Sequence, residues 1–507
     1  MQRGGDSDTI QSTLPDMDIG VQKMQAIPKY HQNGGTINNA GQNLFRRNVG
    51  ENDKESDEYW LHRTQNENKE VKNSLECSEG KNERKNTDVK EKDEETYRTE
   101  LIKILKLDFV GMPEGFEDWN FEQLKEWVTK TGCKINKIPN SLSFMMPGFA
   151  RPGDCGRSAT EKPEWFDLDL FRRGQKFAMA NFFSISCANV ISLCMCFTDR
   201  EILKPLIITG RSNTPYRAFK RYLSTLIRER NWYAEDPWEE GSAAYKDIAI
   251  VRRYHDGIRN RLCNSSREKI EEDSTISDPW SSIRDVFVED ASAACPLNSN
   301  LYDITTKLKY RSFGITQTEM SFTQFAFIAL IITYPEAFGI HNADEADLEA
   351  FCHVWRSIGY LLGIEDEYNF CCGSLRETKQ RSRDAIDMII IPNLRTAHAE
   401  WEHMSRCLVR GMTYIAPTPS YETLILYMTD MLKIPMPRLL ASVDYIIRIR
   451  VAFLKFFFYY IIRIPGMRQI ANTILNKYVE KALAFSPKKH SSLEEKSTKT
   501  LLDFTLG

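Results

Sequence analysis

The feature that most constrains this chain is a run of twenty-one residues without a charge, "FAMANFFSISCANVISLCMCF", at positions 177–197. A run of this length could cross a bilayer as a helix. It also contains two asparagines and three serines, whose polar groups are costly in hydrocarbon, and it lies mid-chain between segments with soluble patterning. We therefore expect a buried helix inside a large core, with a membrane span as the alternative.

Charged residues divide the rest of the chain. Residues 44–98 are dense in Lys, Glu, Asp and Asn, and the stretch "SPKKHSSLEEKSTKT" near the end has a similar composition. Such segments offer too little apolar surface to offset the entropy lost on folding. The predicted organisation is a disordered N-terminal region at 1–95, one folded domain at 96–485 and a disordered tail at 486–507.

Within the folded part the hydrophobic period is helical nearly throughout, and strand-like alternation is scarce. Asn120 and Gln123 form a capping-box pattern that opens a helix ending at Gly132. We predict an all-α fold, a single large helical domain of about ten to twelve helices. Most of these helices are expected at about 168–197, 199–210, 214–231, 242–263, 280–294, 317–333, 344–362, 375–391, 393–409, 420–430 and 436–463.

Composition argues against several classes of function. A net charge of −3, spread over both signs, provides no basic stripe for nucleic acid. The twelve cysteines include no CxxC pair, so we expect reduced and mostly buried thiols. The N-terminus lacks the apolar run of a secretory signal, which predicts a cytoplasmic, non-secreted protein. Phosphate-binding glycine loops, GxSxG and HExxH motifs are absent from the sequence.

The segment "LLASVDYIIRIRVAFLKFFFYYIIRI" at 439–464 is strongly apolar and aromatic, but Asp444, Arg448, Arg450, Lys455 and Arg463 interrupt it. These charges argue against a simple span. They favour a helix that lies on a membrane surface, with its cations reaching from an apolar face to the headgroups. The alternative is a helix packed on the core with a basic outer face.

His255 lies in the amphipathic pattern "YKDIAIVRRYHDGIRNRL" at 245–262. Arg252 and Arg259 fall on the same side of that helix as the histidine. A neutral buried imidazole suits a haem-iron ligand, and two arginines could neutralise the two haem propionates. The alternative is a core histidine whose neighbouring arginines pair with Asp or Glu. The apolar stripe that contains the histidine consists of Ile248, Val251, His255, Ile258 and Leu262.

A second metal hypothesis rests on Glu400 and His403, which have the Glu-x-x-His spacing of di-iron proteins. A di-iron bundle needs two such pairs and two further glutamates, and the core sequence has no second pair. His353, within "DLEAFCHVWRSIGYLLG", is expected to be a hydrogen-bonded core residue.

Five segments occur in order over about 163–410: "PEWFDLDLFRRGQKF", "RAFKRYLST", "IVRRYHDGIRNRL", "MSFTQFAFIALIITYPEAFGI" and "DLEAFCHVWRSIGYLLGIEDEYN". Together, and in this order, they resemble the rubber oxygenase (latex-clearing protein) family, which also includes the endoplasmic-reticulum-bound oxygenase of the mycophenolic-acid pathway. The resemblance implies an all-helical fold around a b-type haem, oxygen chemistry on polyprenyl chains, and His255 as the proximal iron ligand.

Further site residues follow from the same resemblance. Arg221 and Thr225 match the family's Arg-x-x-x-Thr, and helical periodicity places both off the neighbouring apolar arc, where they could face a polar pocket or solvent. Ser224 stands where some relatives carry a lysine, so it cannot supply an amine to the far side of the iron. Glu201 is a candidate for the catalytic base.

The resemblance thus implies a haem b (iron) oxygenase that uses O2 on a hydrophobic isoprenoid or lipid substrate, and the helix at 439–464 predicts peripheral attachment to the endoplasmic reticulum membrane. One alternative is a non-catalytic haem or lipid carrier of the same fold. The other is a di-iron oxidase that uses Glu400 and His403.

Overall fold

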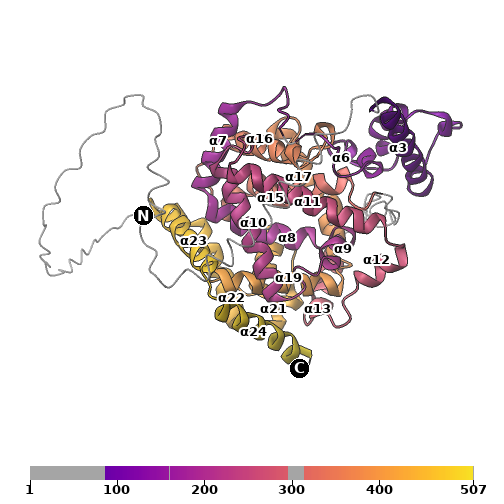
Figure 1. Cartoon of the computed structure of the whole chain (residues 1–507). Coiled ribbons are helices and arrows are strands. Elements are labelled where there is room, and N and C mark those ends of the chain that lie inside the picture. The colour runs from indigo at the N-terminus through magenta and orange to yellow at the C-terminus, as the bar shows by residue number, and fades with distance from the viewer. Residues whose placement is uncertain (1–85, 159, 295–312, 506–507) are drawn as a thin grey trace, which may run out of the picture. The chain divides into compact units, whose positions relative to one another are not determined.

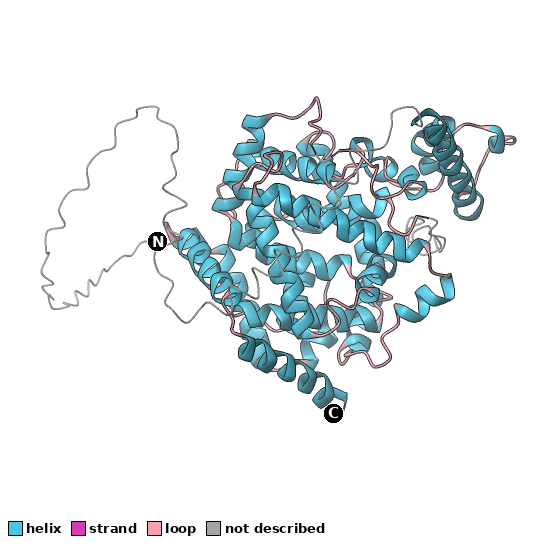
Figure 2. Cartoon of the chain, viewed as in Figure 1, coloured by secondary structure: helices cyan, strands magenta, loops and turns pink. Residues whose placement is uncertain are grey.

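The computed structural model describes residues 86–158, 160–294 and 313–505. Helix is the regular structure throughout these residues and no strand forms among them, as Figure 2 shows; one isolated bridge pairs Pro152 with Thr316. The all-α prediction is confirmed. Of the N-terminal region predicted at 1–95, residues 1–85 lie outside the described residues, and a helix begins at Asn86.

The longer helices, in chain order, are α3 (Asn86–Asp108), α7 (Leu168–Ala180), α8 (Phe182–Cys196), α9 (Arg200–Ile208), α10 (Pro215–Ala234), α11 (Ala243–Cys263), α13 (Arg284–Ala294), α15 (Gln317–Thr333), α16 (Glu345–Leu361), α17 (Leu375–Ala385), α19 (Ala399–Ile415), α20 (Tyr421–Met431), α22 (Tyr445–Tyr459), α23 (Met467–Leu483) and α24 (Pro487–Thr505).

Short helical segments connect them. They are α4 (Phe121–Trp127), α5 (Cys133–Ile135), α6 (Asn140–Ser143), α12 (Arg267–Asp273), α18 (Ile391–Leu394) and α21 (Pro437–Ser442), the 3-10 turns η3 (Phe116–Asp118), η5 (Met146–Ala150), η6 (Pro335–Phe338), η7 (Asp366–Tyr368) and η9 (Ile461–Arg463), and the π turns η4 (Val128–Gly132) and η8 (Ile386–Ile390). The described residues therefore contain more helices than the ten to twelve predicted.

The predicted helix at 168–197 is divided at Asn181, which is one reason for the larger number. The side-chain amide of Asn181 donates to Phe177 O at 2.9 Å, a carbonyl near the end of α7 that also accepts from Asn181 N at 3.1 Å. Asn472 of α23 bonds both sides of the break: its Nδ2 donates to Ala180 O at 2.8 Å, and its Oδ1 accepts from Phe183 N at 2.9 Å. Polar side chains thus satisfy backbone groups that a continuous helix would have paired.

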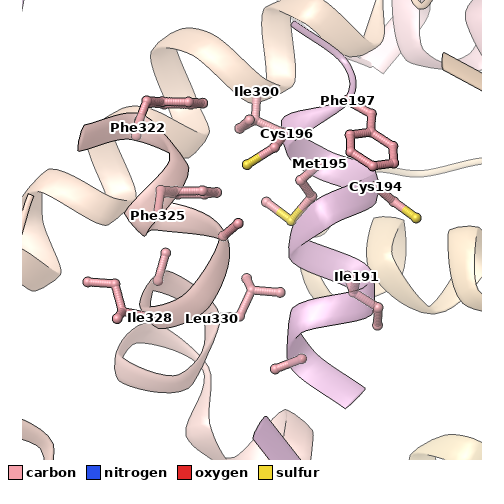
Figure 3. Packing of buried hydrophobic residues seen from close by; sticks show 14 of the residues in the cluster. Ile191, Cys194, Met195, Cys196, Phe197, Phe322, Phe325, Ile328, Leu330 and Ile390 are labelled. Atoms are coloured by element: carbon pink, nitrogen blue, oxygen red, sulfur yellow. The ribbon is translucent and has the colours of Figure 1, made fainter. Parts of the chain in front are cut away.

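The uncharged run forms the centre of the core, as expected. Residues of α8 are buried on every side, and α8 packs against α15; Figure 3 shows Met195 in the same apolar layer as Phe325 and Leu330. Among the described residues no single helix is both long and apolar enough to cross a membrane. Together α7 and α8 meet that criterion, but they are bent by 85°.

Two close helix contacts place the elements around the candidate site. Gly411 brings α19 against α10, because a Cβ at this position would lie 2.7 Å from Phe219 N and 2.9 Å from Pro215 O. Gly174 brings α7 against α16, since a Cβ there would lie 2.1 Å from Ala350 O. Figure 1 shows α10 in the interior of the helical array, beside α8 and α11.

The prediction of a disordered tail at 486–507 is wrong for the described residues, because α24 occupies Pro487–Thr505. This helix packs against the first turn of α10: Ser497 Oγ accepts from Tyr216 N at 3.0 Å, and His490 Nδ1 lies 3.2 Å from the Tyr216 hydroxyl. Composition indicated disorder because α24 has few apolar residues. Besides these polar contacts, the His490 ring lies against Phe219 of α10, with centroids 6.1 Å apart, and Leu493 is buried.

The capping box at α4 is confirmed: Asn120 Oδ1 accepts from Gln123 N, and Gln123 Oε1 accepts from Asn120 N, each at 2.9 Å. The connection after Ile135 runs to α7 and contains α6 and η5. Further along it, Cys155 N donates to Gly363 O at 3.0 Å, which attaches the connection to the end of α16.

Candidate functional site

His255 is in the second half of α11, beside α10. Ser242 caps α11, its side chain accepting from Tyr245 N at 2.9 Å. Although α11 is 21 residues long, its only fully buried residues in the structure as described are Ala244, Ile248 and Leu262. The predicted seam is therefore buried at its ends and only partly covered in the middle, around His255.

The His255 ring is held in its neutral form. Burial lowers the pKa of His255 from its ordinary value of 6.5 to about 4, and the nearby charge of Arg221 lowers this pKa further, while Asp154 acts in the opposite direction. The Nδ1 atom is buried, and no hydrogen bond from the described residues reaches either ring nitrogen. A neutral imidazole with free nitrogens is the form that can bind a metal.

Arg221, on the adjacent face of α10, carries a charge that no carboxylate in the described part of the chain neutralises. The one hydrogen bond its side chain makes there is a long one, 3.4 Å from Nη1 to Ser212 Oγ. Burial lowers the pKa of Arg221, and the charge of Arg211 lowers it too. A partly buried guanidinium without an anion is less favourable than a paired one, so this position suits an anionic ligand group.

Arg252 and Arg259 are arranged differently from Arg221. Arg252 donates from Nε to Asp154 Oδ2 at 2.9 Å and from Nη2 to Oδ1 at 2.5 Å, and its Nη1 donates to Arg157 O at 2.8 Å. Arg259 pairs with Asp256 on its own helix, and its buried Nε has no hydrogen-bond partner among the described residues. These are the aspartate pairs of the alternative, so the two arginines predicted to bind propionates are already paired, whereas Arg221 has no carboxylate partner in that part of the chain.

Ser224 and Thr225 make hydrogen bonds within α10. Thr225 Oγ1 donates to Arg221 O at 3.2 Å, and Ser224 Oγ accepts from Arg228 Nη1. Arg228 also lies 3.3 Å from Asp247 of α11. Arg221, Ser224, Thr225 and His255 are all partly exposed.

Glu201 makes local ion pairs. It lies in the first turn of α9 and forms an ion pair with Lys204, which also pairs with Glu271 of α12. None of the contacts that the structure describes for Glu201 connects it with His255. The hypothesis that Glu201 is a catalytic base therefore has no geometric support.

Glu229 is one of the buried carboxyl groups that the sequence reasoning missed. It lies on α10 and accepts a hydrogen bond at 2.8 Å from the amide of Asn189, a residue of α8. Burial raises the pKa of Glu229 to about 8, and the hydrogen bond from Asn189 acts against this rise. The signal was present, since Leu226, Glu229 and Tyr233 have the 3, 4 spacing of one buried helical face.

The other predicted histidines bond to backbone groups. His403 accepts from Trp280 N at Nδ1, at 2.8 Å, and its Nε2 lies 2.9 Å from Asn213 O. Both ring nitrogens are therefore engaged, and the described residues contain no group of three or more His, Cys, Asp or Glu able to hold a metal ion. His353 Nε2 accepts from Asp167 N at 3.2 Å, so its predicted role as a hydrogen-bonded core residue is confirmed.

Comparison with protein-family models, with curated proteins and with solved structures finds no match to this chain.

Proposed function

We propose that this protein is a haem-dependent oxygenase of the rubber-oxygenase type, acting with O2 on a hydrophobic isoprenoid or lipid substrate. The observation that carries the proposal is that the charge of Arg221 acts on the neutral imidazole of His255, while among the described residues neither the ring nitrogens have a hydrogen-bond partner nor the guanidinium a carboxylate partner. A b-type haem offers a metal to the first group and propionates to the second.

The residues present fit such a group in part. His255 would hold the iron through a ring nitrogen, and Arg221 would bind a propionate in place of Arg252 and Arg259, which are paired with aspartates. The partly covered middle of α11 would lie against the macrocycle. The haem, when bound, would supply the iron at which oxygen reacts.

The chain's own groups have three tasks in this proposal. His255 stays unprotonated at neutral pH, because its pKa of about 4 leaves the ring lone pair free. Arg221 orients an anionic group. Thr225, whose hydroxyl proton is donated to Arg221 O, keeps oxygen lone pairs that can accept a hydrogen bond from a bound molecule.

The test is haem titration of the purified full-length chain, followed by absorption spectroscopy. We expect a Soret band that develops to one equivalent and is lost or much weakened in His255→Ala. His398→Ala is the matched control, since His398 is also partly buried with a lowered pKa and makes no side-chain cap contact at the start of α19. If the parent protein binds no haem, or if both variants bind it equally, the proposal is wrong.

Activity separates the proposal from its alternatives. A polyprenyl substrate supplied with O2 should give a product that depends on His255. Haem uptake without such a product would support the non-catalytic carrier, and bound non-haem iron would support the di-iron alternative.

A further inference from the structure

The large exposed apolar side chains are concentrated in one segment near the C-terminus. Eleven of the fifteen found among the described residues lie between positions 440 and 474. They are Leu440, Tyr445, Ile446, Ile449, Phe453, Phe456, Tyr459, Tyr460, Ile464, Ile470 and Ile474. Isolated exposed apolar residues need no explanation, but a concentration of this kind marks an interaction surface.

On α22 these side chains form a stripe. Ile446, Ile449, Phe453, Phe456 and Tyr460 follow one another at spacings of 3, 4, 3 and 4, so they share one side of the helix. All five side chains are more than half exposed, with Ile449 the lowest at 51%. The inner side of α22 packs against α20 and η6. The outer side therefore carries an apolar stripe, and the exposed basic residues of the packed-helix alternative lie beside it.

Cations flank this stripe. At about 100° per residue, Arg448 and Arg450 fall on opposite sides of it, roughly 120° and roughly 80° from its centre respectively. Both are exposed, and neither pairs with a carboxylate in the part of the chain described. Lys455 pairs with Asp430 at 2.8 Å. Residues 437–483 contain eight Lys or Arg and two Asp or Glu, although the whole chain has a net charge of −3.

We infer that α22, together with Tyr460 and Ile464 that follow it, is an interfacial helix by which the protein docks on a membrane surface rich in anionic lipid. The stripe enters the boundary between headgroups and acyl chains, and Arg448 and Arg450 extend sideways to phosphate or carboxylate headgroups. Tyr445 and Tyr460, near the two ends, have the amphipathic rings that favour this depth. This inference is independent of haem binding.

We assign the stripe to a lipid surface because an anionic bilayer would accept both the apolar side chains and the cations beside them. A second protein copy would meet the same excess of cations on both sides, and like charges face each other across a two-fold interface. An anionic bilayer complements both features, and each cation near such a surface adds to binding.

The test is co-sedimentation of the full-length chain with vesicles of phosphatidylcholine alone and of phosphatidylcholine with about one third phosphatidylserine. We expect binding to the anionic vesicles that falls at high salt. Phe453→Ser with Phe456→Ser should reduce this binding at least tenfold, and Arg448→Ser with Arg450→Ser should reduce it mainly on anionic vesicles. Leu107→Ser is the matched control, because Leu107 is 71% exposed on α3 and lies far along the chain from the stripe.

Hydrogen exchange gives a readout that does not depend on the variants. Peptides covering 445–464 in the parent protein should become protected when anionic vesicles are added. Equal sedimentation of parent and double-serine variant would overturn the inference. A dimer without lipid that the serine substitutions dissociate, or peptides 445–464 already protected in a lipid-free monomer and unchanged by vesicles, would show that protein covers the stripe and would also overturn it.

Discussion

Glu229→Gln tests whether a neutral carboxyl is buried between α8 and α10. The side chain accepts one hydrogen bond from Asn189, and burial raises its pKa from 4.5 to about 8. Because the folded-state pKa exceeds the unfolded value, the folded protein binds the proton more tightly. The contribution of this group to stability is therefore intact below about pH 4, falls as the pH rises through the interval up to about pH 8, and then levels off.

The size of the effect follows from the two pKa values. Ionisation in the unfolded chain costs the parent roughly 1 kcal/mol of stability at pH 5 and about 3 kcal/mol at pH 7. Glutamine keeps the acceptor for Asn189 and does not titrate. The free energy of unfolding of Glu229→Gln, relative to the parent, should therefore increase by about 2 kcal/mol from pH 5 to pH 7.

The assay is urea unfolding of both proteins at half-unit steps from pH 5 to pH 8, followed by tryptophan fluorescence. All other titrating groups are shared, so their contributions cancel in the difference. Glu240→Gln is the control, because it makes the same substitution at an exposed position. A difference between Glu229→Gln and the parent that stays constant with pH would refute the reasoning, since it would mean that Glu229 is ionised in the folded protein.

Two further predictions concern the site and the helix break. Arg221→Gln should raise the pKa of His255 from about 4 towards its ordinary value, because it removes the positive charge that lowers this pKa in addition to burial. NMR titration of the imidazole protons measures the pKa. An unchanged pKa would show that Arg221 is too far from His255 to act on it. Asn472→Ala should lower the free energy of unfolding by about 1–3 kcal/mol, since it leaves backbone groups at the α7–α8 break unpaired. Asn476→Ala is the control and should cost clearly less, because it loses only a 3.4 Å contact with Arg230. Equal losses of the two variants in urea unfolding would contradict this prediction.

Much of the helical pattern could be predicted because it depends on local sequence. Thr316 and Glu319 begin α15 with a capping box, and the predicted 317–333 agrees with the observed helix. The break at Asn181 could not be predicted, because the group that stabilises it, Asn472, is about 290 residues away in the chain. Composition also gave a wrong prediction for α24, because the hydrogen bond from Tyr216 N to Ser497 Oγ depends on where the two residues lie in the fold and not on hydrophobicity.

The residues of the candidate site could be predicted from the sequence, but the ion pair of Arg252 could not, because the two partners of this pair lie far apart in the chain. Spacing placed Arg252 beside His255, but Asp154, which neutralises it, lies 98 positions earlier in a connection without helical periodicity. Arg221 was selected for a match to a family motif, and only the arrangement of α10 against α11 brings its charge near the imidazole. Helical spacing identifies residues on one side of a helix, whereas charge neutralisation depends on what the opposite element presents. The cation best suited to an anionic ligand is therefore the one on the neighbouring helix, Arg221, and not the two that share α11 with His255.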